Sequence, residues 1–517
     1  MKNVNTYTKK ERNSYLAGMF GQNVIYNIIA TGLLGYYLQY VIYLPVIAIG
    51  WIVAVARVWD AINDPMMGTI VDRTKSKWGK CRPYLIIFPA IICVVTILTF
   101  VNGNYAEATT STGRFLIVAW AAVSYIVWGM VYTVGDIPLW GLTSLMTEDE
   151  NDRSKLLGLA RMVAGIGGIG VLVVQIAQVV SKVFIDKGME LNKANQYGFI
   201  ITVTVMTVIS SIMFEFAGTG TKERVSQSEE RHTMKENFKM MWQCKPFRQL
   251  LISGILRSPI QLLMLVVMSF VTYYYANGNF TNIFPAGQPI NFAMLLNIAL
   301  IAVAIFAGQF VAMGITPALI KKFENKTLYN FYSIAGAVPF FLLFIIFKIA
   351  GGDLTPIGWV IVTAVLFTFA SAGMGGINVL QSVMIADCVD YEEYNNGIRP
   401  DGVFFSGQSF ITKLSGGIAA LLQSFVYGAV QFSDKNIEAM NNSLAAGESF
   451  ITYNDGKYAA AMFFLITIPP AIGMVLSAIP TWKYALSDKE HERMLGEIVK
   501  KRLDNKKETP VNEEVSK

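Results

Sequence analysis

Twelve long apolar runs limit what this chain can fold into. Each is about as long as the roughly twenty residues that an α-helix needs to cross a bilayer, whereas transmembrane β-strands are alternating segments of about ten residues. Hydrophobic residues make up 53% of the chain and charged residues 15%, against about 25% charged residues in soluble proteins. The sequence therefore predicts an all-α polytopic membrane protein with twelve transmembrane helices. The runs lie near 16–40, 43–63, 83–102, 114–146, 157–181, 198–218, 249–275, 292–320, 327–350, 355–386, 402–430 and 457–484.

The basic residues predict the orientation of these helices. Most of the 42 Lys and Arg residues fall in segments that are cytoplasmic if both termini are cytoplasmic, which is the positive-inside pattern. The net charge of +6 follows from those inner loops, so it indicates no nucleic-acid partner. The first run follows polar, basic residues and precedes no small-residue cleavage pattern, so we expect a retained helix in a cell membrane.

Several kinds of catalytic or metal site are excluded by the residues present. The four cysteines show no metal spacing, and the two histidines, His232 and His491, lie in polar segments. No GxxxxGK[ST] phosphate loop is present, which argues against ATP-driven transport. An enzyme would need a catalytic constellation and a sensor would need a signalling domain, and the sequence contains neither pattern. We therefore expect a transporter rather than an enzyme.

The halves of the chain echo each other around a charged linker at 219–247. The stretch "GLLGYYLQYV" in the first run corresponds to "SFVTYYYANG" in the seventh, and "RMVAGIGGIG" in the fifth corresponds to "KLSGGIAALL" in the eleventh. Two related six-helix bundles that flank a midplane site are the layout of the major facilitator fold. We predict an N-terminal bundle at 1–218, a C-terminal bundle at 248–486 and a cytoplasmic tail at 487–517.

Ionisable residues inside the predicted helices are functional candidates, because a charge in the bilayer is unfavourable. Asp60 and Asp64 are one helical turn apart and share a helix face. Asp136 and Arg161 are separated by about one helix and one loop, so they can reach a similar depth. The alternative is that such groups form ion pairs between helices. The full set is Arg57, Asp60, Asp64, Asp136, Arg161, Arg257 and Lys413.

Four stretches carry a family resemblance, and they are "RVWDAINDPMMGTIVDRTKSKWGKCRPY", "YTVGDIPLWGLTSLMTEDENDRSKLLGLARMVAG", "VMIADCVDYEEY" and "GQSFITKLSGG". Together they resemble the glycoside–pentoside–hexuronide:cation symporters, the family that includes melibiose permease. The resemblance runs from about 15 to 485. It implies the major facilitator fold, a bacterial inner or plasma membrane, and symport of a sugar with Na⁺, Li⁺ or H⁺, with no resident cofactor.

The resemblance also implies two binding sites. The family's cation positions correspond to Asp60, Asn63, Asp64 and Thr133, where paired carboxylates and neutral oxygens suit a hard cation or a proton. Its sugar-binding and coupling positions correspond to Asp136, Trp140, Arg161, Gln408 and Lys413, and Tyr132 adjoins them. Carboxylate and guanidinium groups can each hydrogen-bond two neighbouring hydroxyls, and an indole stacks on a sugar's apolar face.

The sequence departs from melibiose permease on the first helix. A Lys-Asp pair is replaced here by Gln22-Asn23, which argues against melibiose and places Asn23 among the expected substrate contacts. A glycoside, a pentoside and a hexuronide all stay open, as does the choice of coupling ion. The second candidate function is a carrier of the same fold with a non-sugar cargo such as a lysolipid, against which the polar residues argue.

The cytoplasmic loop that follows the second run is a candidate gate. We expect Asp72 and Arg73 to help hold the bundles together, with basic residues of the loop pairing with Asp387 and Asp390 or capping helix ends. The alternative is that the loop only carries positive-inside charge. The tail beyond Leu486 is too short for the fused regulatory domain that some relatives carry, so we expect a solvated or headgroup-contacting segment.

Overall fold

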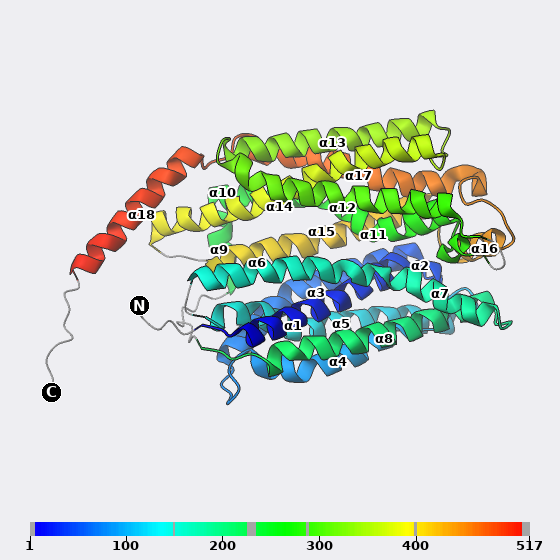
Figure 1. Ribbon diagram of the computed structural model, residues 1–517, viewed down its shortest axis with the longest axis horizontal. Helices are drawn as coiled ribbons and strands as arrows, with labels where there is room; N and C mark the ends of the chain where they lie inside the picture. The colour runs from blue at the N-terminus through cyan, green and yellow to red at the C-terminus, as the bar shows by residue number, and fades with distance from the viewer. Residues whose placement is uncertain (1–5, 148–149, 225–233, 286–288, 398–400, 509–517) are drawn as a thin grey trace. The chain divides into compact units, whose positions relative to one another are not determined.

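The computed structural model describes residues 6–147, 150–224, 234–285, 289–397 and 401–508, and every regular element within these ranges is a helix (Figure 1). The elements of the first half of the chain are α1 (Lys9–Asn27), η1 (Ile28–Tyr37), α2 (Leu38–Tyr40), α3 (Val46–Arg73), α4 (Arg82–Phe100), α5 (Ser111–Leu145), α6 (Glu150–Ile166), η2 (Gly167–Leu172), α7 (Val173–Ile185) and α8 (Leu191–Thr219). Those of the second half are α9 (Met234–Gln243), α10 (Lys245–Leu256), η3 (Ser258–Gln261), α11 (Leu262–Phe270), η4 (Val271–Tyr275), η5 (Phe280–Ile283), α12 (Phe292–Ile320), α13 (Asn325–Ile349), α14 (Ile357–Asn396), α15 (Asp401–Ala429), α16 (Asp434–Ala445), η6 (Tyr453–Gly456), α17 (Lys457–Trp482) and α18 (Asp488–Glu508).

The described residues contain eleven helices that are long and apolar enough to cross a membrane. They correspond to the second through twelfth apolar runs. The first run is also helical, but it is divided into α1, the π-helical η1 and α2, and α1 begins with "KKERNS". These charged residues lower the mean hydropathy of α1, although the rest of the run is apolar. The prediction of an all-α polytopic membrane protein is confirmed.

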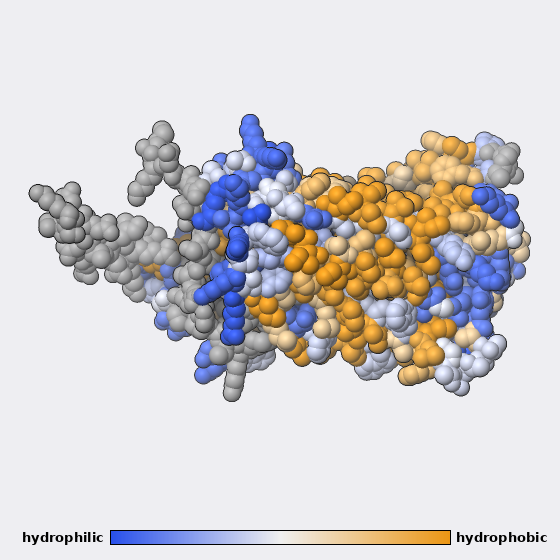
Figure 2. Space-filling view, turned by 90° about the horizontal axis from the view of Figure 1, so that it is seen from below, coloured by the Kyte–Doolittle hydropathy of each residue, from blue (hydrophilic) through white to orange (hydrophobic). Residues whose placement is uncertain are grey.

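The helices present apolar side chains outward. Only 22% of the residues in the most apolar stretch of α12, and 28% of those in α5, are buried inside the protein. Figure 2 shows hydrophobic residues gathered along the middle of the helices, with hydrophilic residues toward both helix ends. An apolar surface flanked by polar ends fits a surrounding of lipid tails and headgroups.

The chain divides into two compact units, each described here by itself. The first comprises 1–230 together with 261–298 and 416–466, and the second comprises 231–260, 299–415 and 467–517. In the first unit α8 packs against α1, α4 and α7, and α5 packs against α3 and α4. Span five is α6–η2–α7, and its six-residue 3₁₀ segment η2 packs against α1. The division into two six-helix bundles stays a prediction.

In the second unit α14 is the longest helix and packs against α10, α13 and α18. Its 40 residues extend about 60 Å at 1.5 Å per residue, twice the hydrocarbon core of a bilayer. The helix α18 packs on α14 with Met494 and Ile498 buried. These residues are one helical turn apart and form an apolar stripe. The expectation of a solvated or headgroup-contacting segment is therefore wrong for the face of α18 that carries Met494 and Ile498.

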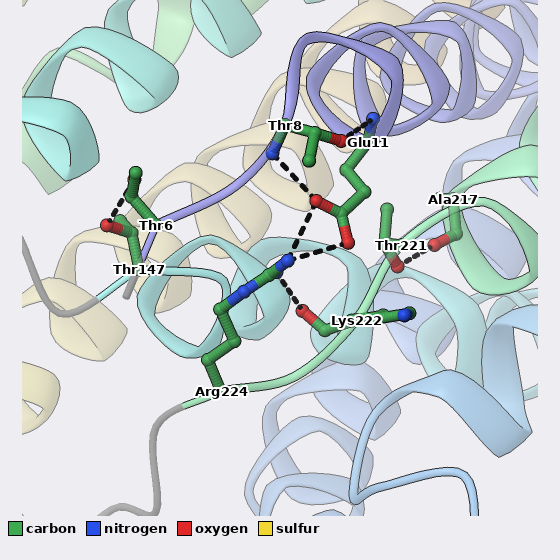
Figure 3. Close-up of polar contacts among 8 residues, drawn as sticks. All are labelled: Thr6, Thr8, Glu11, Thr147, Ala217, Thr221, Lys222 and Arg224. Atoms are coloured by element: carbon green, nitrogen blue, oxygen red, sulfur yellow. Dashed lines mark hydrogen bonds and ion pairs between the residues drawn. The ribbon is translucent and has the colours of Figure 1, made fainter. Parts of the chain in front are cut away.

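The start of α1 is tied to the segment that follows α8 (Figure 3). Arg224 Nη2 donates to both carboxylate oxygens of Glu11 at 2.9 Å, and Glu11 forms a capping box with Thr8. Burial raises the pKa of Glu11, but hydrogen bonds from Thr8 and the Arg224 guanidinium outweigh it and hold the pKa below 4.5. The stabilising contribution of Glu11 is therefore present above about pH 4.5 and is lost as the pH falls through the lower folded-state value.

We predict that Arg224→Met destabilises the first unit by about 1.5–3 kcal/mol, because it removes two charge-assisted hydrogen bonds to a largely buried carboxylate. The apparent melting temperature of the purified protein in detergent should fall by a few degrees. Arg12→Met is the matched control, because the Arg12 guanidinium bonds the exposed side chain of Asn13. Equal melting temperatures for the two variants would contradict a stabilising role for the Glu11–Arg224 pair.

Candidate functional site

The helix α3 places an ion pair inside the first unit. Arg57 Nη1 donates to Asp60 Oδ2 at 3.1 Å, and the Asp60 side chain is 10% exposed. Glycines make room for both residues. A Cβ atom at Gly417 would lie 3.3 Å from Arg57 Cβ, and one at Gly129 would lie 3.2 Å from Asp60 Oδ1. Arg57 thus stands beside one of the two predicted cation-binding carboxylates.

The second predicted cation-binding carboxylate faces α5. Thr133 Oγ1 lies 3.1 Å from Asp64 Oδ1 and 2.9 Å from the carbonyl oxygen of Gly129, and it can donate to either. Asn63 Nδ2 is buried and has no hydrogen-bond partner among the described residues. Among the described residues no three His, Cys, Asp or Glu side chains gather as a metal site. Any cation here would be held by two carboxylates and neutral oxygens.

Gln22 joins three predicted substrate residues, Asn23, Tyr132 and Asp136, in a hydrogen-bonded chain between α1 and α5. Gln22 Nε2 donates to Asp136 Oδ1 at 2.6 Å and to the Tyr132 hydroxyl. Asn23 Nδ2 donates to Gln22 Oε1 at 2.6 Å and to the carbonyl oxygen of Met19 at 2.8 Å. Gln22 is 3% exposed, and it was not among the substrate contacts expected from sequence. The departure from the family pattern at this position was the only signal that singled it out.

The two clusters meet on α5. Tyr132 and Thr133 are consecutive, and the first contacts Gln22 while the second lies against Asp64. Two aromatic rings stack on this part of α5. The ring centroids of Trp128 and Tyr132 lie 4.7 Å apart, and the angle between the ring planes is 21°. Trp128 Nε1 also donates to Thr96 Oγ1 of α4 at 3.0 Å. A displacement of this turn of α5 would therefore change contacts in both clusters.

The remaining predicted substrate residues lie on three helices. Trp140 follows Asp136 on α5 by one turn and is 36% exposed, and Arg161 is exposed on α6. Gln408 and Lys413 belong to α15 within the second unit, where Gln408 Nε2 lies 3.4 Å from Ser382 Oγ. The first unit thus brings together Gln22, Asn23, Tyr132 and Asp136. The roles of all these residues stay predictions.

The chain matches a family model described as "MFS/sugar transport protein" over residues 14–488. It belongs to this family of the major facilitator superfamily. Membership confirms the predicted resemblance and the fold class.

Two curated relatives of this sugar-transport family member align over nearly its whole length. The isoprimeverose transporter of Lactiplantibacillus pentosus is 24% identical, with 95% of this chain and 91% of that protein covered. The glucuronide carrier protein homolog of Escherichia coli (strain K12) is 22% identical, with 95% of both chains covered. The proteins compared here are transporters, and the chain is a multi-pass membrane protein of the same family.

Solved structures agree on the fold. The nucleoside transporter NupG matches with a TM-score of 0.56 and 14% identity, covering 92% of this chain and 99% of that chain. A partially occluded inward-open form of the xylose transporter XylE from E. coli matches with a TM-score of 0.55 and 13% identity, covering 93% and 99%. At this identity the likeness shows the major facilitator fold alone.

The loop between α3 and α4 is held by the first unit's own linker. The Glu223 carboxylate accepts hydrogen bonds from the backbone N–H groups of Lys80, Cys81 and Arg82 at 2.7, 2.8 and 3.0 Å. A carboxylate at the N-terminal end of a helix such as α4 is favourable, because several N–H groups there lack intrahelical partners. Arg73 is exposed, and the side chain of Asp72 lies outside the described residues. Their predicted gating role stays a prediction.

The other two predicted gating residues contact α18 within the second unit. His491 Nε2 lies 3.1 Å from Asp390 Oδ2, and His491 Nδ1 lies 3.6 Å from Asp387 Oδ1. Asn325 Nδ2 of α13 donates to Asp387 Oδ2 at 3.2 Å, and the Asn325 backbone N–H donates to Asp488 Oδ2 at 2.9 Å. The hydrogen bond with Asp390 raises the pKa of His491 above 6.5, burial opposes it, and the charges of Asp387, Asp390 and Asp488 add to the increase.

We predict that α18 docks less firmly on α14 as the pH rises. Protonated His491 stabilises the docked helix fully below about pH 6.5, and this contribution is lost as the pH rises through the raised folded-state pKa. Hydrogen-exchange protection of α18, corrected for the intrinsic exchange rate, should fall several-fold between about pH 6 and about pH 8. His491→Gln keeps a donor for Asp390 but carries no charge. Burial raises the pKa of Asp387 to about 6, so this variant keeps the pH dependence of that carboxyl group but loses the part due to His491. A wild-type profile that falls no more steeply than that of His491→Gln would contradict the role of the His491 charge.

Proposed function

We propose that this protein is a secondary active transporter that carries a sugar together with a cation, Na⁺, Li⁺ or H⁺, by alternating access. The observation that carries the proposal is the pair of consecutive residues Tyr132 and Thr133. Tyr132 belongs to the Gln22–Asp136 cluster and Thr133 lies against Asp64. One turn of α5 therefore joins a site suited to a sugar and a site suited to a cation.

The proposal of a cation site is based on the oxygen atoms that could bind the cation. Asp60 and Asp64 supply two carboxylates on one face of α3, and Thr133 supplies a hydroxyl oxygen. Turning the buried amide of Asn63 by half a rotation would add a carbonyl oxygen in place of the unpartnered Nδ2. Hard cations prefer such oxygen ligands, and a shared proton would equally relieve the repulsion between the acids. The Asp60–Arg57 ion pair keeps the charge of Asp60 compensated while the site is empty.

The sugar half rests on the amides and Asp136. A carboxylate accepts and an amide both donates and accepts, so Asp136, Gln22 and Asn23 can exchange their mutual hydrogen bonds for bonds to sugar hydroxyls. Relatives are named for isoprimeverose, lactose, raffinose and a glucuronide, which span a pentose-containing glycoside, hexosides and a hexuronide. A glycoside, pentoside or hexuronide is the substrate class that we propose. The Gln22 and Asn23 side chains are uncharged, so they do not select the acidic hexuronide over the neutral sugars. We place both termini in the cytoplasm on the strength of the basic inner segments.

The test separates the two halves with three variants of similar size, namely Asp60→Asn, Asp64→Asn and Asp136→Asn. Membrane vesicles are offered labelled isoprimeverose, lactose, raffinose and p-nitrophenyl-β-glucuronide, with Na⁺, Li⁺ and pH varied separately. The wild-type protein should accumulate at least one of these sugars in a cation-dependent way. Asp60→Asn and Asp64→Asn should retain sugar exchange but lose cation stimulation, which typically amounts to about 5–150-fold. Asp136→Asn should lose sugar binding while cations still stabilise the protein in the absence of sugar.

Two outcomes would contradict the proposal. Wild-type vesicles that accumulate none of the four sugars under any cation gradient would remove its basis. Uphill accumulation with normal ion dependence in both Asp60→Asn and Asp64→Asn would place the cation elsewhere. Asp186→Asn after α7 is the matched control, because it makes the same change at an exposed carboxylate outside both clusters, and it should transport as the wild type does.

A further inference from the structure

Span five approaches span one through glycines. In η2 a Cβ atom at Gly167 would lie 2.7 Å from Asn23 Cβ and 3.0 Å from the carbonyl oxygen of Phe20. A Cβ atom at Gly170 would lie 2.5 Å from the carbonyl oxygen of Val24 and 2.9 Å from Asn27 Cβ. Carbon atoms in contact normally lie about 3.5–4.0 Å apart. The backbones of α1 and η2 are therefore closer than a side chain at position 167 or 170 would allow.

The 3₁₀ conformation explains why these two glycines act together. A 3₁₀-helix has 3.0 residues per turn, so residues three apart eclipse each other. Gly167 and Gly170 therefore both face α1 and are both buried. Gly168 lies between them in the same element, and a Cβ atom there would meet nothing within 4 Å. The same is true of Gly165, which precedes η2 on α6.

The residues that the glycines touch are connected to Asp136. Asn27 Nδ2 donates to the Asn23 carbonyl oxygen at 2.8 Å, and Asn23 Nδ2 donates to Gln22 Oε1 at 2.6 Å. Gln22 Nε2 in turn donates to Asp136 Oδ1 at 2.6 Å. The first two bonds lie within α1, and only the Gln22–Asp136 bond joins α1 to α5. A shift of α1 by about 1 Å would therefore lengthen the Gln22–Asp136 bond beyond the normal hydrogen-bond range. Three hydrogen bonds thus connect the residues at the η2–α1 contact to Asp136 in the predicted sugar site.

Span five also carries Arg161, six residues before Gly167 on the continuous α6–η2 segment. The spacing between α1 and η2 therefore affects the distance between Arg161 on α6 and the Gln22 and Asn23 side chains on α1. The carboxylates of the cation cluster lie on α3, and Thr133 lies on α5. They have no part in the glycine contact.

We propose that Gly167 and Gly170 are positioning residues for the sugar, which hold Asn23 and Gln22 in register with Asp136 by letting α1 rest directly on η2. This inference rests on the proposed function. A Cβ atom at either position forces α1 away from η2 and displaces one wall of the sugar site, while the cation cluster keeps its geometry. The effect is specific to sugar affinity.

The test compares Gly167→Ala with Gly168→Ala, which changes the same residue type in the same 3₁₀ element without a contact. The probe is whichever of isoprimeverose, lactose, raffinose and p-nitrophenyl-β-glucuronide the wild-type protein binds in detergent. Gly167→Ala should bind that sugar about tenfold more weakly or worse, as expected for a misplaced hydrogen bond to a charged group. Gly168→Ala and Gly165→Ala should bind it within about twofold of the wild type. The stabilisation of Gly167→Ala by Na⁺ or by acid without sugar, measured as a melting-temperature shift, should equal that of the wild type.

A milder variant covers the case in which Gly167→Ala does not insert. Asn27→Ala keeps the Cβ atom and the close packing but removes the hydrogen bond to the Asn23 carbonyl, and it should weaken sugar binding about threefold. Sugar affinities of Gly167→Ala and Asn27→Ala equal to that of Gly168→Ala would overturn the inference, as would equal losses of sugar and cation binding in Gly167→Ala. A wild-type protein that binds none of the four sugars is a different result, because it contradicts the proposed function itself.

Discussion

The burial of carboxylates in an apolar protein is the constraint on which the site depends. A carboxylate moved from water into a low-dielectric interior is strongly destabilised unless it is paired and hydrogen-bonded. Asp60 meets this requirement through Arg57, three residues earlier on the same helix, and Asp64 meets part of it through Thr133 of α5. Both contacts are local, and the proposed function requires that a bound cation can replace them. Removing either partner alone would leave a charge uncompensated, which is more unfavourable than removing the whole pair.

The same constraint applies to the neighbouring Gln22–Asp136 cluster, which is the proposed sugar site. The Asp136 carboxyl group accepts a hydrogen bond from the Gln22 amide. A hydrogen bond from a neutral amide is weaker than one from a guanidinium, so under the proposed function this Gln22 bond is the one exchanged for a sugar hydroxyl. The stacked rings of Trp128 and Tyr132 lie on the turn of α5 that immediately precedes Thr133. In the proposed mechanism, binding in one cluster shifts the other through this part of α5.

Much of the fold follows from hydropathy alone, because lipid leaves a spanning chain little alternative to the helix. The predicted run at 292–320 coincides with α12, whereas the run at 355–386 falls short of the end of α14 at Asn396. That extension is polar, so hydropathy does not detect it. The π-helical segment η1 escaped prediction because its register depends on tertiary packing. The residue types of the site were predicted from motifs, but the Gln22–Asp136 bond depends on the distance between two helices, which no local pattern contains.

The central claim is that the two clusters are energetically coupled through α5, and reciprocal binding measurements test it most directly. The dissociation constant of the sugar is measured with and without a saturating cation, and that of the cation with and without saturating sugar. The account predicts that each ligand tightens the other by the same factor, within the roughly 5–150-fold range of typical coupling. It also predicts that Thr133→Val, which removes the hydroxyl beside Asp64, lowers that factor. A factor of one in the wild-type protein would contradict the account, because the two sites would then bind independently.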